Sequence, residues 1–492
     1  MIDLIRQHRR LFLLLMLAGV ALRLLFIIFY PVTQGDTFIY GDIAKNWLSH
    51  GVFGQTINGE PEPTLIRLPG YPGFLAVCFT LFGREHYNAV RFVQLLMDMA
   101  ACFFVADLAR RLIGNRAAKV AFALGVLCPF TANYVALPLA ETPSIFCTVL
   151  AFWFAACGLE TWRAREWVGC GLASAVGILM RPDNGIVLAV IVGFVVAHAL
   201  YRARSHGEGT GNWRREGTGN WEQGTKRRRT KGVLRPANIK SAAIAVLLVC
   251  VVALAPLVPW TIRNWRVFHV IQPLAARYAN NPDEDPHLGF QQWTKTWMGE
   301  YVSVVEVYWH VTGEEVDPKL LPSRAFDNAD ERQKTDEIFA AYNESNSLPP
   351  ELDQQLAQLA RERRQRRPLR YYVWLPTARI ADMWLRPRTE MLGIMERWWE
   401  YWTDPVDFTK ALAYAVLNLL YVAAGVWGMI ARGRRVRYAG LLIAFVVLRS
   451  LFLGTLENPE PRYTLEMFPV LWIFAAALMD KSLQKRQPVV AQ

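Results

Sequence analysis

Two carboxylates stand just beyond the first long apolar run of the chain. Asp36 and Asp42 lie in GDTFIYGDIAKNWLSHGVFG, after an apolar stretch that ends near Tyr30. Asp36 can lie at most about two helical turns beyond that stretch, where lipid headgroups would lie. A carboxylate there could act as a base on an acceptor hydroxyl. The alternative is an ordinary loop residue that follows a turn-forming Gly, and Asp42 fits a helix surface better than a catalytic role.

A third acid, Glu141, stands alone between two apolar runs in LPLAETPSIF. A carboxylate at a helix start stabilises the helix dipole, and the nearby Pro143 is consistent with that modest role. The alternative interpretation makes Glu141 a second acid of an active site, facing Asp36.

Arginines and further acids stand beside the ends of other apolar runs. They are Arg67 in RLPGYPGF, Arg181 and Asp183 in MRPDNG, Arg263 in PWTIRNW, and Glu457 and Arg462 in LENPEPRYTLEMFP. Guanidinium groups match phosphate oxygens in geometry and charge, so such a group of residues would suit a phosphate and a sugar. Arginines at helix ends can also reach the interface with no further function.

Metal chemistry has little support in the sequence. The eight histidines are scattered, and only Glu306 and His310 stand one helical turn apart, a spacing that is common on helix surfaces. No metal is required, and a divalent cation is left open as a cofactor. Inside apolar runs, Arg23, Asp98 and Arg449 are ionisable groups at membrane depth, for which we favour internal pairing over function.

Ten apolar runs are candidates for membrane-spanning helices, so the sequence predicts an all-α polytopic membrane protein. They are Leu11 to Tyr30, Ala89 to Leu108, Ala117 to Ala136, Pro143 to Leu159, Val168 to Met180, Gly185 to Leu200, Ala242 to Pro259, Phe408 to Ile430, Ala439 to Leu456 and Thr464 to Met479. The shorter run Tyr71 to Phe82 is predicted to be an interfacial helix on the outer side.

The basic residues indicate which loops lie on the cytoplasmic side of the membrane. With a cytoplasmic N-terminus, every short basic cluster falls on the inner side, including the run from Arg202 to Lys240 and the cluster from Arg432 to Arg437. This places the protein in the plasma (inner) membrane as a multi-pass protein, with its candidate site on the extracytoplasmic, periplasmic face.

Three parts follow from this organisation. Residues 1–260 form a transmembrane module with an outer loop at 31–88, residues 261–407 an extracytoplasmic domain, and residues 408–492 the last transmembrane helices. A repeated EGTGNW at 208–213 and 216–221 marks residues 202–240 as a low-complexity cytoplasmic insertion. In the outer domain, Leu352, Leu356 and Leu359 predict an amphipathic helix behind Pro349 and Pro350.

Composition agrees with a membrane protein. Hydrophobic residues make up 53% of the 492 residues, and the net charge of +12 lies in short segments between apolar runs. Membrane lipids are therefore the expected partners, and nucleic acid is not. The seven cysteines all sit in apolar segments without CxxC spacing, which argues against a disulfide framework.

The ordered motifs resemble the GT-C superfamily of membrane glycosyltransferases, specifically family 39. That family includes the dolichyl-phosphate-mannose protein mannosyltransferases and the lipid A aminoarabinose transferases. The resemblance rests on the GD-x-x-x-Y-x-x-I-A-x-N start of the first loop, RLPGYPGFL, RRLIGNRAAKVAFALGVLCPF, LAETPSIF, MRPDNG, PWTIRNWRVF and the late PRY, in this order over most of the chain.

The resemblance implies roles for individual residues. Asp36 matches the acid taken as the catalytic base, and Glu141 stands at the position of a second acid. Residues implied to bind donor or acceptor are Arg67, Tyr71, Arg181, Asp183, Arg263 and Arg462. The mannosyltransferases carry two adjacent acids at the first position, whereas Thr37 follows Asp36 here, which weakens an assignment to protein mannosylation.

The expected activity is transfer of a sugar from a polyprenyl-phosphate donor to a glycan, lipid or protein acceptor. Nucleotide sugars are made in the cytoplasm, so an outer active site needs a lipid-linked donor. A single displacement with Asp36 as base would invert the anomeric carbon. The alternatives are a transporter or flippase for lipid-linked sugars and an O-antigen-ligase-like polymerase.

Overall fold

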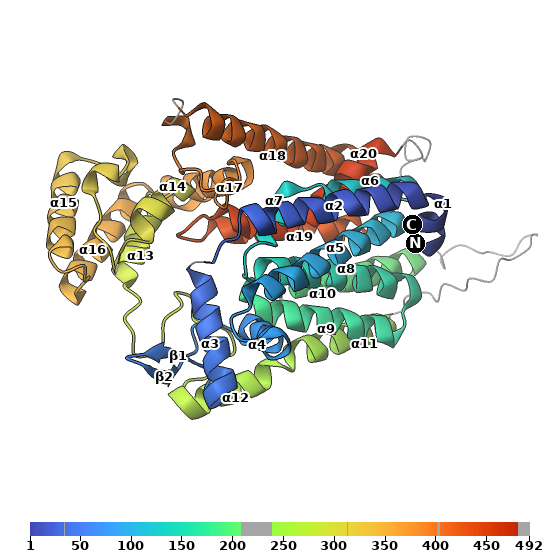
Figure 1. Cartoon of the computed structure of the whole chain (residues 1–492), viewed down its shortest axis with the longest axis horizontal. Coiled ribbons are helices and arrows are strands. Elements are labelled where there is room, and N and C mark those ends of the chain that lie inside the picture. Colours follow the sequence, from blue (N-terminus) through green and yellow to red (C-terminus); the bar gives the residue numbers. More distant parts are fainter. Residues whose placement is uncertain (34, 208–238, 312, 401–403, 481–492) are drawn as a thin grey trace, which may run out of the picture.

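The structure, a computed structural model, describes residues 1–33, 35–207, 239–311, 313–400 and 404–480. A helix occupies each of the ten predicted spans (Figure 1). These helices are α2 (Arg9–Phe29), α5 (Tyr87–Leu112), α6 (Asn115–Val126) with α7 (Pro129–Tyr134), α8 (Glu141–Thr161), α9 (Ala164–Met180), α10 (Gly185–Gly207), α11 (Ile239–Leu254) with α12 (Leu257–Phe268), α18 (Pro405–Arg432), α19 (Ala439–Gly454) and α20 (Phe468–Met479). A short α1 (Ile2–Gln7) precedes them.

Seven helical segments of the described residues are long and apolar enough to cross a membrane. The helices of the remaining spans, α6, α9 and α19, are shorter. The span predicted at 117–136 is divided into α6 and α7 because Pro129 lacks the N–H that would continue the α6 hydrogen bonds. The predicted class, an all-α multi-pass membrane protein, is confirmed.

The helices form a bundle with buried central members and apolar outer faces. Almost all of α20 is buried, whereas Leu14 and Phe29 of α2 and Trp427 and Ile430 of α18 are at least 60% exposed. Large apolar side chains on the outer surface of a bundle are what a lipid environment requires.

Arg23 and Asp98 pair inside the bundle, as predicted. The Arg23 Nη2 and Asp98 Oδ2 atoms are 2.6 Å apart, and both side chains are almost fully buried. The guanidinium also donates to the Gly19 and Val126 carbonyls, so the charge joins α2, α5 and α6 and leaves no polar group unsatisfied.

A compact group of elements lies between α2 and α5. It comprises α3 (Asp36–His50), the antiparallel hairpin of β1 (Gly54–Ile57) and β2 (Glu60–Pro63), and α4 (Gly70–Phe82), which matches the predicted interfacial helix. Asn58 and Gly59 both have positive φ, as a two-residue hairpin turn requires. Asp42 lies on α3 outside the site, and its carboxylate accepts from Thr56 and fastens the hairpin.

A helical cap, residues 288–366, covers one end of the bundle (Figure 1). Its elements are α13 (Leu288–Lys295), α14 (Tyr301–Ser303), η3 (Val304–Tyr308), η4 (Pro318–Leu320), η5 (Ser323–Ala325), α15 (Ala329–Asn343) and α16 (Pro350–Arg366). The predicted amphipathic helix is confirmed as α16, with Leu356 and Leu359 buried in a core around Trp293 and Phe339. After the cap, η6 (Arg370–Trp374) and α17 (Leu375–Leu385) lead back to the bundle.

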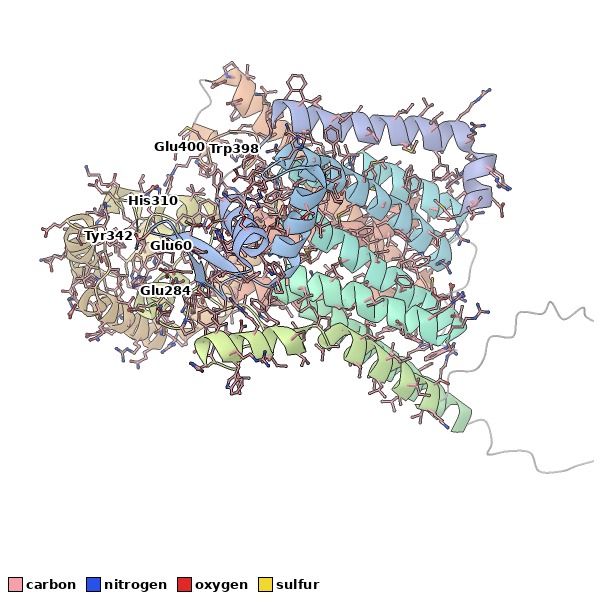
Figure 2. The ribbon with its side chains drawn as sticks, turned by 60° about the horizontal axis from the view of Figure 1, so that its bottom comes forward. Glu60, Glu284, His310, Tyr342, Trp398 and Glu400 are labelled. Atoms are coloured by element: carbon pink, nitrogen blue, oxygen red, sulfur yellow. The ribbon has the colours of Figure 1, made fainter. Side chains whose placement is uncertain are left out.

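Figure 2 shows His310 and Tyr342 among the cap helices. The Glu306 carboxylate pairs with Arg397, and His310 lies beside Glu314, so the two residues do not converge on a metal. No cluster of three potential metal-binding residues occurs in the described ranges. The EGTGNW repeat lies outside the described residues.

Candidate active site

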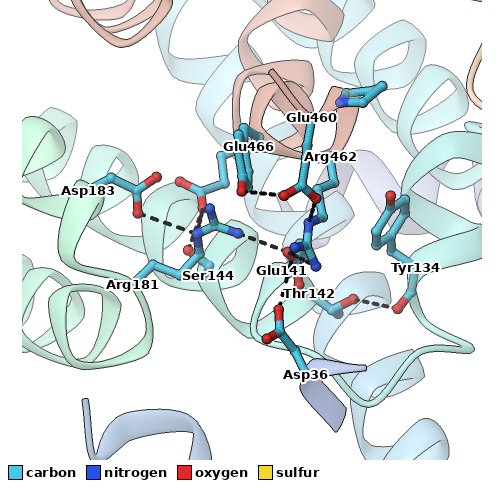
Figure 3. Close-up of polar contacts among 12 residues, drawn as sticks. Asp36, Tyr134, Glu141, Thr142, Ser144, Arg181, Asp183, Glu460, Arg462 and Glu466 are labelled. Carbon is cyan, nitrogen blue, oxygen red and sulfur yellow. Dashed lines mark hydrogen bonds and ion pairs between the residues drawn. The ribbon is translucent and has the colours of Figure 1, made fainter. Parts of the chain in front are cut away.

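The main cavity lies where the bundle, α3 and the cap meet. Its volume is about 500 Å³, within the roughly 300–1,000 Å³ usual for small-molecule sites. Six predicted site residues line it together, and they come from distant parts of the chain: Asp36, Arg67, Glu141, Arg181, Asp183 and Arg462. Figure 3 shows Asp36, Glu141, Arg181 and Arg462 converging on one point.

Asp36 is the first residue of α3, and its position depends on Gly35. Gly35 has a φ of 54°, a left-handed conformation that glycine adopts without a steric penalty. The Asp36 carboxylate lies 2.7 Å from Arg67 Nη2 and 3.4 Å from Arg462 Nη2. Burial raises the pKa of Asp36, but the two guanidinium groups more than offset it and hold the pKa below its usual value. Asp36 is therefore a carboxylate at neutral pH.

Arg67 is placed by the loop before α4. Its Nη1 donates to the Ile66 carbonyl, and its guanidinium lies 5.6 Å from the centre of the Tyr40 ring. Gly70 permits this arrangement because a Cβ at that position would lie only 2.4 Å from the Leu179 carbonyl group at the end of α9. The RLPG part of the motif thus holds α4 against α9.

Glu141 begins α8, and its side chain is only 5% exposed. Arg181 Nη1 donates to its Oε1 at 2.8 Å, and Arg462 Nη1 lies 3.7 Å from the same oxygen. Arg181 is extended because it precedes Pro182, which disfavours the helical conformation and ends α9. This turn aims the Arg181 side chain back across α8, so Glu141 joins two arginines from separate helices.

Further ion pairs lie behind Glu141 and Arg181. Asp183 pairs with Arg181 at 3.3 Å and with Arg449 at 2.7 Å, and Arg449 also pairs with Glu466 at 3.0 Å. Arg449 is fully buried, so the predicted internal pairing holds, although its partner Asp183 lines the cavity. The network joins the turn between α9 and α10, α19 and the turn before α20.

Arg462 stands at the centre of the cluster. It lies in η9 (Pro461–Met467), the short turn that precedes α20. Its guanidinium contacts the carboxylates of Asp36, Glu141 and Glu460. Arg462 of the PRY motif therefore contacts both Asp36 of the first predicted outer loop and Glu141 of the second.

The part of the cavity around Glu457 is lined by basic, aromatic and apolar side chains. Arg277 and Lys295 both pair with Glu457, at 2.7 and 3.3 Å. Tyr308 and the half-exposed Trp309 of the cap also line this end. Phe452, Leu453 and Leu456, at and just beyond the C-terminal end of α19, supply an apolar wall beside Glu457.

Two predicted site residues lie outside the cavity lining. The Tyr71 hydroxyl is buried and donates to Gln94 at 2.9 Å. Arg263 donates to the Thr64 and Phe53 carbonyls at 2.8 and 2.7 Å, among the rings of Phe53, Trp260 and Phe268. Its guanidinium thus fastens α12 to the hairpin loop and does not face the site.

Several lining residues were not predicted. They are Glu460, Arg277, Tyr308 and Trp309, with Glu466, Arg449 and Lys295 behind them. Glu460 directly precedes the PRY motif, so its position in the sequence could have indicated that it belongs to the site. Arg277 and the cap aromatics lie in segments without any motif, and only the fold brings them to the cavity.

Part of the chain matches a known family. The model of the dolichyl-phosphate-mannose-protein mannosyltransferase family matches residues 63–207. This confirms the expected resemblance over the segment that contains Arg67, Glu141 and Arg181. No curated protein matches the chain.

Three solved structures were found to be similar to the chain, one of them with a TM-score above 0.5. The oligosaccharyltransferase of Archaeoglobus fulgidus tethered with an acceptor peptide has a TM-score of 0.51 at 12% identity, over 98% of this chain and 52% of that one. The same enzyme in complex with Zn and sulfate has a TM-score of 0.48 at 11% identity, over 96% of this chain and 49% of that one. ArnT from Cupriavidus metallidurans bound to undecaprenyl phosphate has a TM-score of 0.38 at 15% identity, over 95% of this chain and 77% of that one.

The chain therefore has a GT-C type membrane fold, as predicted. It spans about half the length of the oligosaccharyltransferase.

Proposed function

We propose that this protein transfers a sugar from a polyprenyl-phosphate donor to an acceptor on the extracytoplasmic face, with inversion at the anomeric carbon and Asp36 as the general base. The uneven charge of one cavity supports the proposal most strongly. Donor phosphate, sugar and base each find suitable surroundings there, at distinct positions.

The end of the cavity around Asp36 holds more carboxylates than cations. Five carboxylates meet four guanidinium groups: Asp36, Glu141, Asp183, Glu460 and Glu466 with Arg67, Arg181, Arg449 and Arg462. These arginines are already engaged by carboxylates. An additional anion is disfavoured here, whereas the hydroxyl groups of a sugar would find many acceptors.

The end around Glu457 is basic. Arg277 and Lys295 share the single carboxylate of Glu457, and Arg379 lies behind them, fully buried and hydrogen-bonded to the backbone carbonyls of Met298, Gly454 and Lys295. Three cations and one acid favour a phosphate at this end. The phosphate gains a negative charge when it leaves the sugar, and fixed cations would stabilise that charge in the transition state.

The lipid chain of the donor also suits this end. Phe452 and Leu456 border the cavity next to Glu457, and the outward side chains of α19, such as Leu448 and Leu451, are about half exposed. A polyprenyl chain could therefore run from the phosphate along the outer face of α19 into the bilayer.

The reaction would be a single displacement. The acceptor oxygen attacks the anomeric carbon while the bond from that carbon to the phosphate oxygen breaks. The proton of the acceptor hydroxyl passes to Asp36, and polyprenyl phosphate departs toward Arg277 and Lys295. In a single displacement the acceptor oxygen attacks from the side opposite the departing phosphate, so the configuration at the anomeric carbon would be inverted.

Glu141, Arg67, Arg181, Asp183 and Arg462 would bind the sugar and orient Asp36. Glu141 is held by two arginines and is a positioning group in this scheme, since the arginines that touch it also touch Asp36 or Asp183.

The test is turnover in proteoliposomes without an ion gradient. Radiolabelled polyprenyl-phosphate sugars are supplied as a panel, with glycan, lipid and peptide acceptors, and transferred label and released polyprenyl phosphate are measured. We expect transfer from at least one donor, with equal amounts of both products. Movement of labelled lipid across the bilayer without any transfer would overturn the proposal in favour of a flippase.

A further inference from the structure

The segment that joins α16 to α17 exposes large apolar side chains next to one another. Leu369, Tyr372, Val373 and Trp374 are 71, 63, 51 and 69% exposed. They belong to one turn, η6, and the residue before it. A contiguous apolar patch of this kind marks a contact with a membrane or a partner rather than an ordinary surface.

The patch lies at the level where the bundle ends. The following helix, α17, packs along the outer end of α19: a Cβ at Gly454 would lie 2.9 Å from Ile380 and Pro376, and Trp384 Nε1 donates to Ser450 at 3.1 Å. α19 is one of the apolar bundle helices, so its end marks the boundary between acyl chains and headgroups. Exposed Trp and Tyr side chains are typical of that boundary.

A cluster of basic residues adjoins the patch, around a hollow of only about 10 Å³. Its lining includes Asp327, Tyr371 and four arginines: Arg363, Arg364, Arg367 and Arg370. Asp327 engages Arg363 and Arg370, at 3.7 and 2.8 Å. Arg364 lies 5.9 Å from the centre of the Tyr371 ring, and neither it nor Arg367 has a carboxylate within ion-pair distance in the part of the chain that the structure describes.

We infer that this segment binds the phosphate headgroup of an anionic phospholipid of the outer leaflet. Arg364 and Arg367 would contact the phosphate, while Trp374 and its neighbours lie among the acyl chains. A cation is attracted to an anionic headgroup, and the guanidinium geometry suits a phosphate. The inference rests on the proposed orientation only for the choice of leaflet.

The site has a structural route to the active-site cavity. Arg363, beside Arg364, donates to the Thr296 hydroxyl at 3.0 Å, and Arg379 of α17 donates to the Lys295 carbonyl at 2.7 Å. Lys295 in turn pairs with Glu457 at the cavity. A bound lipid would therefore brace the basic end of the cavity from outside.

The experiment measures binding to purified full-length protein without any sugar donor. Thermal stability in neutral detergent is followed while phosphatidylglycerol, phosphatidylcholine or inorganic phosphate is added, and bound lipid is counted by native mass spectrometry. We expect stabilisation and retained lipid with phosphatidylglycerol alone. In Arg364→Gln/Arg367→Gln, the half-maximal concentration should rise about tenfold or more, as loss of two charged contacts implies.

Two further variants make the test specific. Arg364→Lys/Arg367→Lys keeps the charge and should retain most of the effect. Arg332→Gln/Lys334→Gln removes two positive charges from exposed side chains of α15 and should leave the effect unchanged. An undiminished response to phosphatidylglycerol in the Arg364/Arg367 glutamine variant would overturn the inference, as would equal stabilisation by inorganic phosphate. Because no donor is present, either result is independent of transferase activity.

Discussion

At the residue scale, the proposed chemistry depends most on Asp36. Asp36→Asn keeps the size of the side chain and removes the proton acceptor, so transfer should fall by roughly 10²- to 10⁴-fold while donor binding persists. Asp42→Asn is the matched control, because Asp42 lies on the same helix, holds the hairpin and is outside the cavity lining. Both are measured in membranes at equal protein levels. Near-normal transfer by Asp36→Asn would remove this residue from the mechanism.

The ion pairs of Asp36 predict an unusual pH dependence. Arg67 and Arg462 lower the pKa of Asp36 against the effect of burial. The carboxylate must be ionised to accept a proton, so kcat/KM is lost only as pH falls through this lowered pKa, below the usual range of an Asp. Arg67→Gln should raise that pKa and move the acidic limb of the kcat/KM profile to higher pH. An acidic limb at the same pH in both proteins would contradict the assignment.

Two arginines, one at the proposed donor site and one outside the cavity lining, should behave differently. Arg277→Gln removes a cation from the basic end of the cavity and should weaken donor affinity by about 10- to 100-fold. Arg263→Gln removes the guanidinium hydrogen bonds to the Thr64 and Phe53 carbonyls and should cost about 1–3 kcal/mol of stability with little effect on donor affinity. Donor binding and thermal unfolding are measured for both variants. The opposite pattern would restore Arg263 to the site.

Local sequence could indicate Asp36, Glu141 and Arg181, because each stands where an apolar run ends and polar chemistry begins. Sequence position alone could not separate Arg462, which faces the cavity, from Arg263, which binds backbone carbonyls. Both stand beside apolar runs, and only the direction of the side chain differs. That direction depends on contacts between segments about 200 residues apart, such as Arg263 with Thr64.

At the element scale, the site depends on how closely α4 and α9 approach. Gly70→Val would place a Cβ 2.4 Å from the Leu179 carbonyl group, so the two helices must separate and move Arg67 away from Arg181. We expect lower thermal stability and a large loss of transfer. Gly73→Ala is the control on the same helix, because its Cβ would meet only Trp47 at an ordinary 3.6 Å. Equal behaviour of the two variants would contradict this role of Gly70.

Helices were predicted well because a run of about 20 apolar residues has few alternatives in a bilayer. The break between α6 and α7 follows from Pro129, which the prediction overlooked within an apolar run. The hairpin was missed as well, although Asn58 and Gly59 form a common turn pair. It is short and polar, and it is held by α3 side chains that no local pattern relates to it.

At the scale of the whole molecule, the cap and the segment before it supply cavity residues that the bundle does not. The bundle and α3 supply the acidic end of the cavity, and the chain from α12 to the residue after η3 supplies the basic end, through Arg277, Lys295 and the cap aromatics. The sequence predicted a separate segment at 261–407 from its polarity. It could not predict that this segment closes over the site, because the cap packs on the bundle through contacts that no periodicity encodes.

The orientation in the membrane is the remaining prediction, and the proposed lipid-linked donor depends on it. The basic clusters place the cap outside and the turn between α18 and α19 inside. Six of the seven native cysteines are buried and the seventh is partly buried, so the background of labelling by an impermeant thiol reagent should be low. In intact cells, Lys334→Cys on α15 should react, and Arg434→Cys in η8 (Gly433–Arg435) should react only after the cells are opened. The reverse pattern would place the cavity on the cytoplasmic side, where nucleotide sugars are available, and would remove the reason for a lipid-linked donor.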